Sequence, residues 1–151
     1  MGSNAKSLSA DEMFCHAIYS TWHVVNRSYK KHLSRLGLTY PQYITLTLLW
    51  ETDHRNVSDI ASALAMETNT LTPLLKRLEA NGLVSRRRSQ EDERQVVVSL
   101  TSEGRELQSN AEKITVCMIR DTGLKQRELE GLIDALSSMR TSLGKTLVSD
   151  Q

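Results

Sequence analysis

Two cysteines carry the most reactive side chains of this chain. Cys15 lies in MFCHAIYSTW, residues 13–22, and Cys117 lies in TVCMIR, residues 115–120. A thiolate is readily oxidised to a sulfenic acid, whereas a cysteine on an apolar helix face is usually an inert packing residue. The residues alone leave both interpretations open for each cysteine. His16 and His23 near Cys15 do not complete the closed ligand set that zinc requires, so we expect neither a metal site nor a cofactor.

Positive charge is concentrated in one segment of the chain. The formal net charge is only +1, and residues 101–151 hold seven bases and eight acids. Between residues 72 and 90, by contrast, five bases face the single acid Glu79: Lys76, Arg77, Arg86, Arg87 and Arg88. Such a local excess is what a surface that binds DNA phosphates needs. A merely solvated basic surface is the alternative.

The composition is that of an ordinary globular chain. Of its 151 residues, 39% are hydrophobic and 25% are charged, which is enough for one domain with a substantial core. There is no apolar run of membrane-spanning length and no secretory segment, so we expect no membrane partner and a cytoplasmic protein with reduced cysteines. The opening MGSNA is typical of a cloning leader, and we assign residues 1–8 to it.

The first half of the chain has helical periodicity. Ser9 and Glu12 form a capping box, which predicts a helix from Ser9 to about Leu36, ended by Gly37. This start would put Cys15 beyond the first turn, where the helix dipole has largely faded. A second helix is expected near Pro41, apolar nearly all round and therefore central to the core.

Two further helices follow at short spacing. Ser58 is the expected cap of the first, and Asn69 or Thr70 the expected cap of the second, with Pro73 in its first turn and Gly82 at its end. The second helix has an apolar stripe on one face and polar or basic residues on the other. Two helices joined by a short turn in this way are typical of a helix-turn-helix.

Residues 83–88 and 94–101 then read as two strands around the turn SQEDE, and residues 102–120 and 125–148 as two amphipathic helices. We predict a mostly α protein with a small β-hairpin wing: a winged helix-turn-helix in a single domain, residues 9–151. Residues 9–40 and 101–151 would be dimerisation helices, and residues 41–100 a DNA-binding lobe with its wing at 83–100. The unpartnered apolar stripes of the terminal helices predict a homodimer, and an extended single-chain core is the alternative.

This arrangement places the basic residues for DNA binding. Thr70, Thr72, Lys76 and Arg77 would face the major groove, while Arg88 and Arg94 flank the hairpin tip and would reach the minor groove or backbone. Asp92 either holds the guanidinium of Arg94 or is a solvated turn residue. The residues predicted to contact DNA are Asn69, Thr70, Thr72, Pro73, Lys76, Arg77, Arg86, Arg88, Asp92 and Arg94.

Four motifs together carry a family resemblance. LGLTYPQY, TLTPLLKRLEANGLVSRRRS, DER and LTSEG resemble the MarR family of transcription regulators, and more narrowly its organic-hydroperoxide-resistance repressor branch, OhrR. The resemblance spans residues 15–104. It implies a homodimer that binds a pseudo-palindromic operator in double-stranded DNA. It also assigns Thr70, Thr72, Pro73, Lys76 and Arg77 to the recognition helix, and Asp92 and Arg94 to the wing.

The branch further implies that an organic hydroperoxide oxidises Cys15, whose thiolate is hydrogen-bonded by Tyr29 and Tyr40. Cys117 matches the region where some members carry a resolving thiol. Tyr19 lies one turn from Cys15 and could also approach it. Tyr29 lies about 21 Å further along a continuous helix, so it can serve only the thiol of a second subunit, whereas Tyr40, beyond the helix end, could reach a thiol of either chain.

The sequence thus predicts a repressor that releases its operator when Cys15 is oxidised, not an enzyme. One alternative is a MarR-type repressor released by a small aromatic or anionic effector, with Cys15 as a packing residue. A thiol peroxidase that uses Cys15 as its nucleophile is the other.

Overall fold

The structure is a computed structural model that describes residues 9–149. The predicted leader, residues 1–8, lies outside this range. The chain forms two compact units, one ending at Ile114 and the other beginning at Thr115. The predicted division into dimerisation helices and a DNA-binding lobe stays a prediction.

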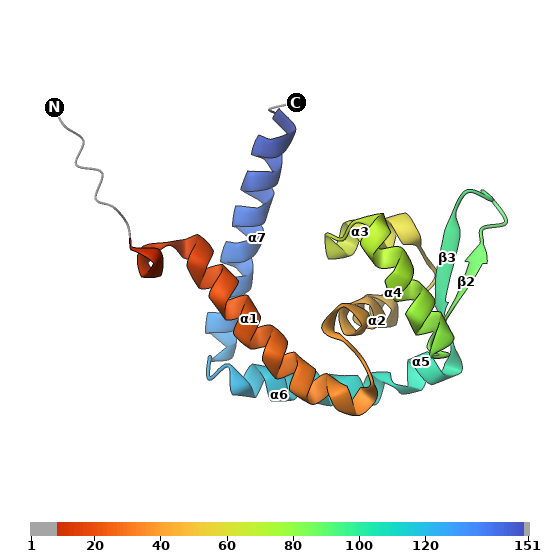
Figure 1. Ribbon diagram of the computed structural model, residues 1–151, viewed down its shortest axis with the longest axis horizontal. Helices are drawn as coiled ribbons and strands as arrows, with labels where there is room; N and C mark the ends of the chain where they lie inside the picture. Colours follow the sequence, from red (N-terminus) through yellow and green to blue (C-terminus); the bar gives the residue numbers. More distant parts are fainter. Residues whose placement is uncertain (1–8, 150–151) are drawn as a thin grey trace. The chain divides into compact units, whose positions relative to one another are not determined.

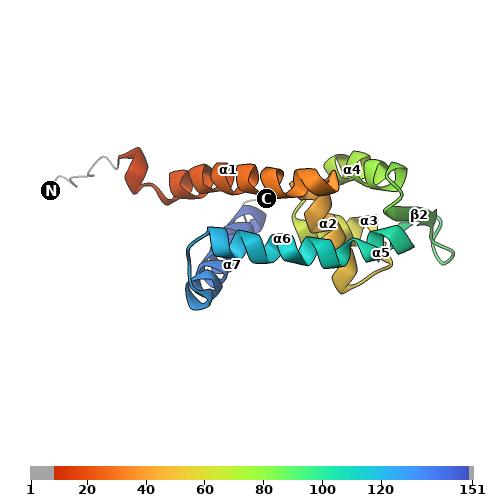
Figure 2. The same cartoon turned by 90° about the horizontal axis from the view of Figure 1, so that it is seen from below.

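The first long helix begins later than predicted. The backbone N–H of Ser9 donates to the Glu12 carboxylate at 3.0 Å, but this capping box closes only the 3₁₀ turn η1, Ala10–Glu12. Met13 then adopts extended backbone, and the helix α1 runs over Phe14–Leu33, with η1 set off at its start in Figure 2. Cys15 is therefore in the first turn of α1, not beyond it. The 3₁₀ turn η2, Ser34–Leu36, follows, and Gly37 has φ 67°.

Helix α2, Tyr40–Glu51, lies at the centre of the core as predicted. Thr39 caps it, accepting from the Gln42 N–H while the Gln42 amide accepts from the Thr39 N–H at 2.9 Å. Leu46 and Leu49 are fully buried. The helix is apolar on nearly all sides because other elements cover nearly all of it.

Helices α3, Val57–Leu64, and α4, Thr68–Ala80, form the predicted helix-turn-helix. The N-caps were wrong: they are Asn56 and Glu67, in extended backbone, each just before the first helical residue. Because α4 begins at Thr68, Pro73 lies in its second turn, where its ring cannot donate to the Asn69 carbonyl. The apolar stripe of α4 is buried as predicted, at Leu71, Leu74, Leu75 and Leu78.

The wing consists of β2, Val84–Arg88, and β3, Val96–Leu100, paired antiparallel with Val84 opposite Leu100 and Arg88 opposite Val96. In Figure 1 the hairpin projects beyond α4. A two-residue strand that the sequence did not indicate, β1, Arg55–Asn56, pairs with the other side of β3. It is too short to show a period of its own.

The predicted helix over residues 102–120 is two helices, α5, Ser102–Glu106, and α6, Gln108–Asp121. The Trp50 indole N–H donates to the Gly104 carbonyl at 2.9 Å, and this is the acceptor that Gln108 would use in a continuous helix. The last helix is α7, Gln126–Ser149, and the apolar residues of its predicted stripe are largely exposed: Leu132, Ile133, Leu136, Leu143 and Leu147.

Candidate nucleic-acid interface and thiol site

The outer face of α4 carries the predicted DNA-contacting residues. One face of the helix is buried, and the opposite face exposes Asn69, Thr70, Pro73, Lys76 and Arg77. Thr72 differs from these because it is half-buried and its hydroxyl donates to the Thr68 carbonyl at 2.9 Å. The exposed residues offer cations and hydroxyls on one side of one helix, which is the arrangement that groove reading requires.

Arg86 is held by Glu79 at the base of the wing. Its Nε and Nη2 donate to Glu79 Oε2 at 2.9 and 2.7 Å, and its backbone N–H donates to Oε1 at 2.9 Å. The hydrogen bonds from the guanidinium lower the pKa of Glu79 below its usual value. Arg86 thus ties β2 to the end of α4. The DNA contact predicted for it stays a prediction, and its charge is already compensated.

The tip of the wing is closed by backbone bonds. The Ser89 N–H donates to the Gln95 carbonyl at 2.8 Å, and Asp92 Oδ1 accepts the backbone N–H of Arg94 at 3.0 Å. Asp92 therefore binds the backbone of Arg94, so the idea that it holds the guanidinium is not borne out. Arg88 and Arg94 are both exposed, and their side chains are available to a ligand outside the protein.

A cavity of about 320 Å³ separates α4 from the wing. Its wall combines hydroxyl groups, apolar side chains and two arginines: Asn56, Val57, Ser58, Thr68, Thr72, Leu75, Arg86, Arg94, Gln95 and Val96. The wing and the recognition helix therefore contact each other at the base, through Arg86, and leave a gap toward the tip.

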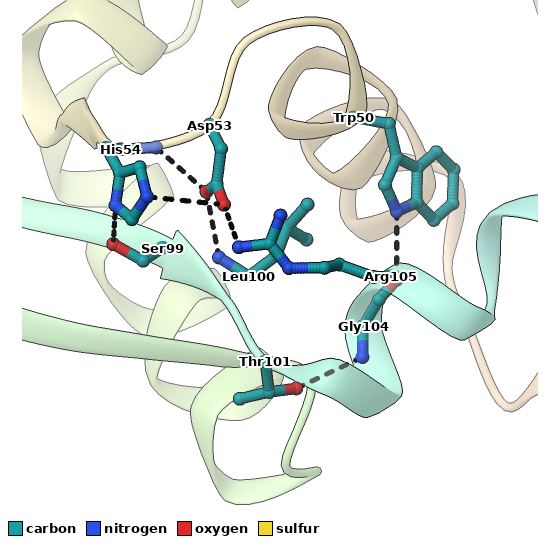
Figure 3. Close-up of polar contacts among 8 residues, drawn as sticks. All are labelled: Trp50, Asp53, His54, Ser99, Leu100, Thr101, Gly104 and Arg105. Atoms are coloured by element: carbon teal, nitrogen blue, oxygen red, sulfur yellow. Dashed lines mark hydrogen bonds and ion pairs between the residues drawn. The ribbon is translucent and has the colours of Figure 1, made fainter.

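Asp53, just after α2, joins three elements (Figure 3). Its Oδ1 accepts the N–H groups of His54 at 2.8 Å and Leu100 at 2.9 Å, and its Oδ2 accepts from Arg105 Nη2 at 2.6 Å. Burial raises the pKa of Asp53, but the backbone N–H donors of Leu100 and His54, together with the nearby side chains of His54 and Arg105, outweigh it and hold the pKa below its usual value.

His54 and Trp50 complete this joint. His54 has φ 58°, and its Nδ1 lies 2.7 Å from Ser99 Oγ, while Trp50 binds the Gly104 carbonyl (Figure 3). The end of α2 is thus fixed to both β3 and α5. The sequence did not indicate this cluster, because the partners that bond across the joint are 45 or more residues apart.

The tyrosines predicted to serve the thiol are in contact with each other. The rings of Tyr29, on α1, and Tyr40, at the start of α2, have centroids 4.8 Å apart, and Tyr43 lies 5.7 Å from Tyr29. Burial, followed by the neighbouring phenols Tyr40 and Tyr43, raises the pKa of Tyr29 to about 12. Burial, followed by Tyr43, also raises the pKa of Tyr40. Both phenols are therefore neutral O–H donors at physiological pH.

Trp22 is a member of this cluster that the sequence analysis did not place there. Its ring lies edge-to-face against Tyr40 with centroids 5.0 Å apart, and 43% of the residue remains exposed. Tyr19, the third predicted thiol partner, lies edge-to-face against His23 with ring centroids 4.4 Å apart and is 64% exposed.

Both cysteines have free thiols. Cys15 is exposed and is the second residue of α1. It therefore lies at the positive, N-terminal end of the helix dipole, which favours the thiolate over the thiol. Tyr29 lies fourteen residues further along the same helix, so the two side chains of one chain do not meet. Cys117 is half-buried on α6.

No three His, Cys, Asp or Glu side chains gather as they would around a metal ion within residues 9–149. Over the same range, every helix is too short or too polar to cross a bilayer.

Comparison with known proteins identifies the family. The model of the family described as Transcriptional regulator SarA/Rot matches residues 27–111, more than half of the chain. The chain is 43% identical to the HTH-type transcriptional regulator TtmR of Methylorubrum extorquens, over 89% of this chain and 69% of that protein. It is 37% identical to the Organic hydroperoxide resistance transcriptional regulator of Bacillus subtilis, over 90% of each chain.

The chain belongs to the MarR/SarA family of transcriptional regulators. The similarity to the Bacillus subtilis protein supports the OhrR-type branch of that family. Among solved structures, this MarR/SarA-family chain resembles reduced AbfR of Staphylococcus epidermidis bound to DNA, with 33% identity, a TM-score of 0.73, and coverage of 85% of this chain and 89% of AbfR. The disulfide form of AbfR matches with a TM-score of 0.64 and 33% identity over 83% and 88% of the two chains. The predicted family and winged-helix fold are confirmed.

Proposed function

We propose that this MarR/SarA-family regulator is a cytoplasmic homodimeric repressor that releases a pseudo-palindromic operator when an organic hydroperoxide oxidises Cys15. The observation that carries the proposal is the contact between Tyr29 and Tyr40, two neutral phenols whose rings lie at a tilt against each other. Tyr29 lies on α1, which also carries the exposed Cys15, and Tyr40 begins α2. Their hydroxyls would donate hydrogen bonds to a Cys15 thiolate.

DNA binding is assigned to α4 and the wing. The exposed face of α4 enters the major groove, and Arg88 and Arg94 reach the backbone or minor groove on the flank. Glu79 and Arg86 hold these two parts in register. Two copies read two half-sites, which is why the operator is pseudo-palindromic.

The thiol reaction follows from the side chains present. The Cys15 thiolate attacks the terminal oxygen of the hydroperoxide, the O–O bond breaks, and the alkoxide leaves and takes up a proton to become an alcohol. Cys15 is then a sulfenic acid. It condenses with a thiol, either Cys117 of the second copy or a small cellular thiol, forming a disulfide and releasing water.

The sensor site requires two copies. The phenol O–H groups of Tyr29 and Tyr40 would stabilise the thiolate as hydrogen-bond donors. Tyr29, however, lies about 21 Å along the helix from the Cys15 of its own chain, so it can donate only to the thiolate of another copy. The exposed apolar residues of α1 and α7 are consistent with burial against a second copy. Each site therefore takes its thiol from one copy and its tyrosines from the other.

Helix α2 is the element that would transmit oxidation to the DNA-binding face. Tyr40 is its first residue, and at its other end Trp50 and Asp53 are bonded to α5 and β3. A displacement of Tyr40 thus moves an element that is fixed directly to the wing. To change operator occupancy about a hundredfold, oxidation has to weaken binding by about 2.7 kcal/mol.

Two relatives support the proposal by what their names describe. The Bacillus subtilis relative is an organic hydroperoxide resistance regulator, and AbfR has been solved reduced on DNA and with a disulfide formed.

The test is DNA binding by the reduced protein, repeated after one equivalent of cumene hydroperoxide, with Cys15→Ser as the matched variant. The probe is the promoter region beside its own gene. Release by the wild type and retention by Cys15→Ser is the expected result. If both proteins stay bound after the hydroperoxide, Cys15 is a packing residue and release depends on a small effector instead. If oxidation continues through many turnovers with a thiol reductant and no DNA, the protein is a thiol peroxidase.

A further inference from the structure

Pro73 deprives one backbone carbonyl of α4 of its helical donor. The other proline, Pro41, is the second residue of α2, where an N–H has no helical partner in any case. Pro73 instead lies inside α4, five residues after its first residue. An N–H at this position would donate to the Asn69 carbonyl, but proline has none, and its ring crowds the carbonyl four residues before it. The Asn69 carbonyl is therefore an acceptor without the donor that a regular helix supplies.

The neighbouring carbonyl, that of Thr68, is in the opposite situation. Thr72 Oγ1 donates to it at 2.9 Å, in addition to the backbone N–H that regular helix geometry places there. Thr72 is half-buried and lines the cavity beside the wing, whereas Asn69 and Pro73 are exposed. A ligand that approaches the exposed side of α4 thus meets the carbonyl that lacks its donor.

This carbonyl lies near the middle of the exposed face of α4. Asn69 and Pro73 are about 40° apart around the helix axis and nearly opposite the buried leucine stripe. Lys76 and Arg77, about one turn further on, are exposed as well. The same face is the one that the proposed function places in the major groove.

An acceptor in the major groove distinguishes bases by their donors. Adenine N6 and cytosine N4 carry N–H groups there, whereas guanine offers the acceptors O6 and N7 and thymine the acceptor O4. In the free protein, water can satisfy an exposed carbonyl. When the groove displaces this water, adenine or cytosine restores the hydrogen bond. Guanine or thymine sets acceptor against acceptor and leaves both unpaired, which costs affinity.

We propose that the Asn69 backbone carbonyl, freed by Pro73, reads one base of each operator half-site by its amino group, so that adenine and cytosine are accepted and guanine and thymine rejected. The proposal rests on the major-groove assignment of α4 in the proposed function and adds a determinant of specificity. Side chains leave a different pattern, because an asparagine amide selects adenine and an arginine selects guanine. A preference shared by adenine and cytosine is what a single carbonyl produces.

A scan of all single base-pair substitutions in one half-site tests this pattern. The reduced protein is titrated with operator duplexes from the promoter region beside its own gene, and fluorescence anisotropy gives each affinity. We expect one position at which, on one strand, adenine and cytosine bind within about threefold of each other. Guanine and thymine at that position should bind about tenfold more weakly.

Pro73→Ala restores the N–H at residue 73 and with it the helical hydrogen bond to the Asn69 carbonyl. Alanine is also the better helix former, so this variant should fold. The discrimination at the one position should fall below about threefold, with the other positions unchanged. Asn69→Ala is the matched control, because it removes the side-chain amide and keeps the backbone carbonyl. In this control the discrimination should survive.

A change in the DNA repeats the test without altering the protein. Replacing adenine by unsubstituted purine at the same position removes the N6 amino group. We expect wild-type binding to weaken about fivefold and Pro73→Ala binding to change little, so that the two alterations are coupled.

Three results would overturn the proposal. One is a scan without any position that accepts adenine and cytosine and rejects the other two bases. Another is such a position that persists in Pro73→Ala. The third is its loss in Asn69→Ala, which would assign the reading to the side-chain amide.

The scan uses no hydroperoxide, so the base pattern is measured whether or not the protein senses peroxides. Conversely, release of the operator on oxidation of Cys15 without this base pattern refutes the role of the carbonyl and leaves the proposed function standing.

Discussion

The rings of Tyr29 on α1 and Tyr40 on α2 are in tilted contact with their centroids 4.8 Å apart, and Cys15 of the same chain lies fourteen residues from Tyr29 along α1. The phenols are thus assembled within one chain, and in the proposed dimer a second copy would supply the thiol. Replacing one tyrosine by phenylalanine keeps its ring and removes its hydroxyl, so the effect of that hydroxyl on the oxidation of Cys15 can be measured.

Tyr29→Phe keeps the ring and removes only the O–H donor. We expect the oxidation of Cys15 by cumene hydroperoxide to slow by about tenfold or more, since a hydrogen bond to a charged group contributes about 1.5–3 kcal/mol. Stopped-flow kinetics measure the rate, and DNA binding by the reduced protein should not change. Tyr43→Phe is the matched control, because the Tyr43 hydroxyl donates to the Ala111 carbonyl. Equal rates for both variants would exclude Tyr29 from the sensor site.

The raised pKa of Tyr29 predicts a loss of stability in alkali. Its pKa is about 12 in the folded protein, against 10.0 for the free side chain, so the fold favours the neutral phenol. This contribution is fully present below about pH 10 and is lost as the pH rises toward about 12. Urea unfolding across this range should show a steeper decline for the wild type than for Tyr29→Phe. Parallel curves would contradict the assignment.

Arg86 and Arg94 are expected to behave differently on DNA. Arg94→Ala should weaken binding and reduce the slope of log affinity against log salt by about one, because an exposed arginine releases a counterion on contact. Arg86→Ala should leave the slope nearly unchanged and destabilise the fold by about 1 kcal/mol, since the guanidinium is already bound to Glu79. Fluorescence anisotropy at several salt concentrations separates them. A larger slope change for Arg86→Ala would place Arg86 on the DNA.

Asp53→Asn removes the charge at the joint of α2, β3 and α5. We expect a loss of about 2 kcal/mol of stability at neutral pH, typical of a hydrogen bond to a charged group. The pKa of Asp53 is lowered in the fold, so its contribution is present above about pH 4 and disappears as the pH falls through the folded value. The wild type and the variant should therefore converge in acid.

Asp134→Asn, an exposed position on α7, is the control for this change and should have little effect. A difference between wild type and Asp53→Asn that persists in strong acid would show that the charge of Asp53 does not stabilise the joint. Denaturant unfolding followed by circular dichroism at several pH values measures both variants.

The features that sequence predicted correctly are local ones. The apolar stripe Leu71, Leu74, Leu75 and Leu78 and the strand over VVVSL follow from the residue types and spacing of near neighbours. The order of elements, and with it the winged helix-turn-helix, could be read in the same way. The basic segment at the recognition helix is likewise visible in the chain itself.

Features that depend on contacts between residues far apart in the sequence were predicted wrongly or not at all. The helix is broken at Leu107, beside the Gly104 carbonyl that the Trp50 indole binds, and β1 is a two-residue strand defined by its pairing with β3. Neither the pairing of Arg86 with Glu79 nor the joint at Asp53 has a signal in the residues around it. The edge-to-face contact of Trp22 with Tyr40, between α1 and α2, likewise has no signal in the neighbouring residues.

The sequence by itself therefore determined the periodic elements, their order and the residue types available for binding DNA and for oxidation. Tertiary structure decided which of these side chains meet: Tyr29 with Tyr40, and Arg86 with Glu79. The reason is physical. Periodicity follows from the backbone geometry of adjacent residues, whereas these contacts depend on how whole elements pack across the core.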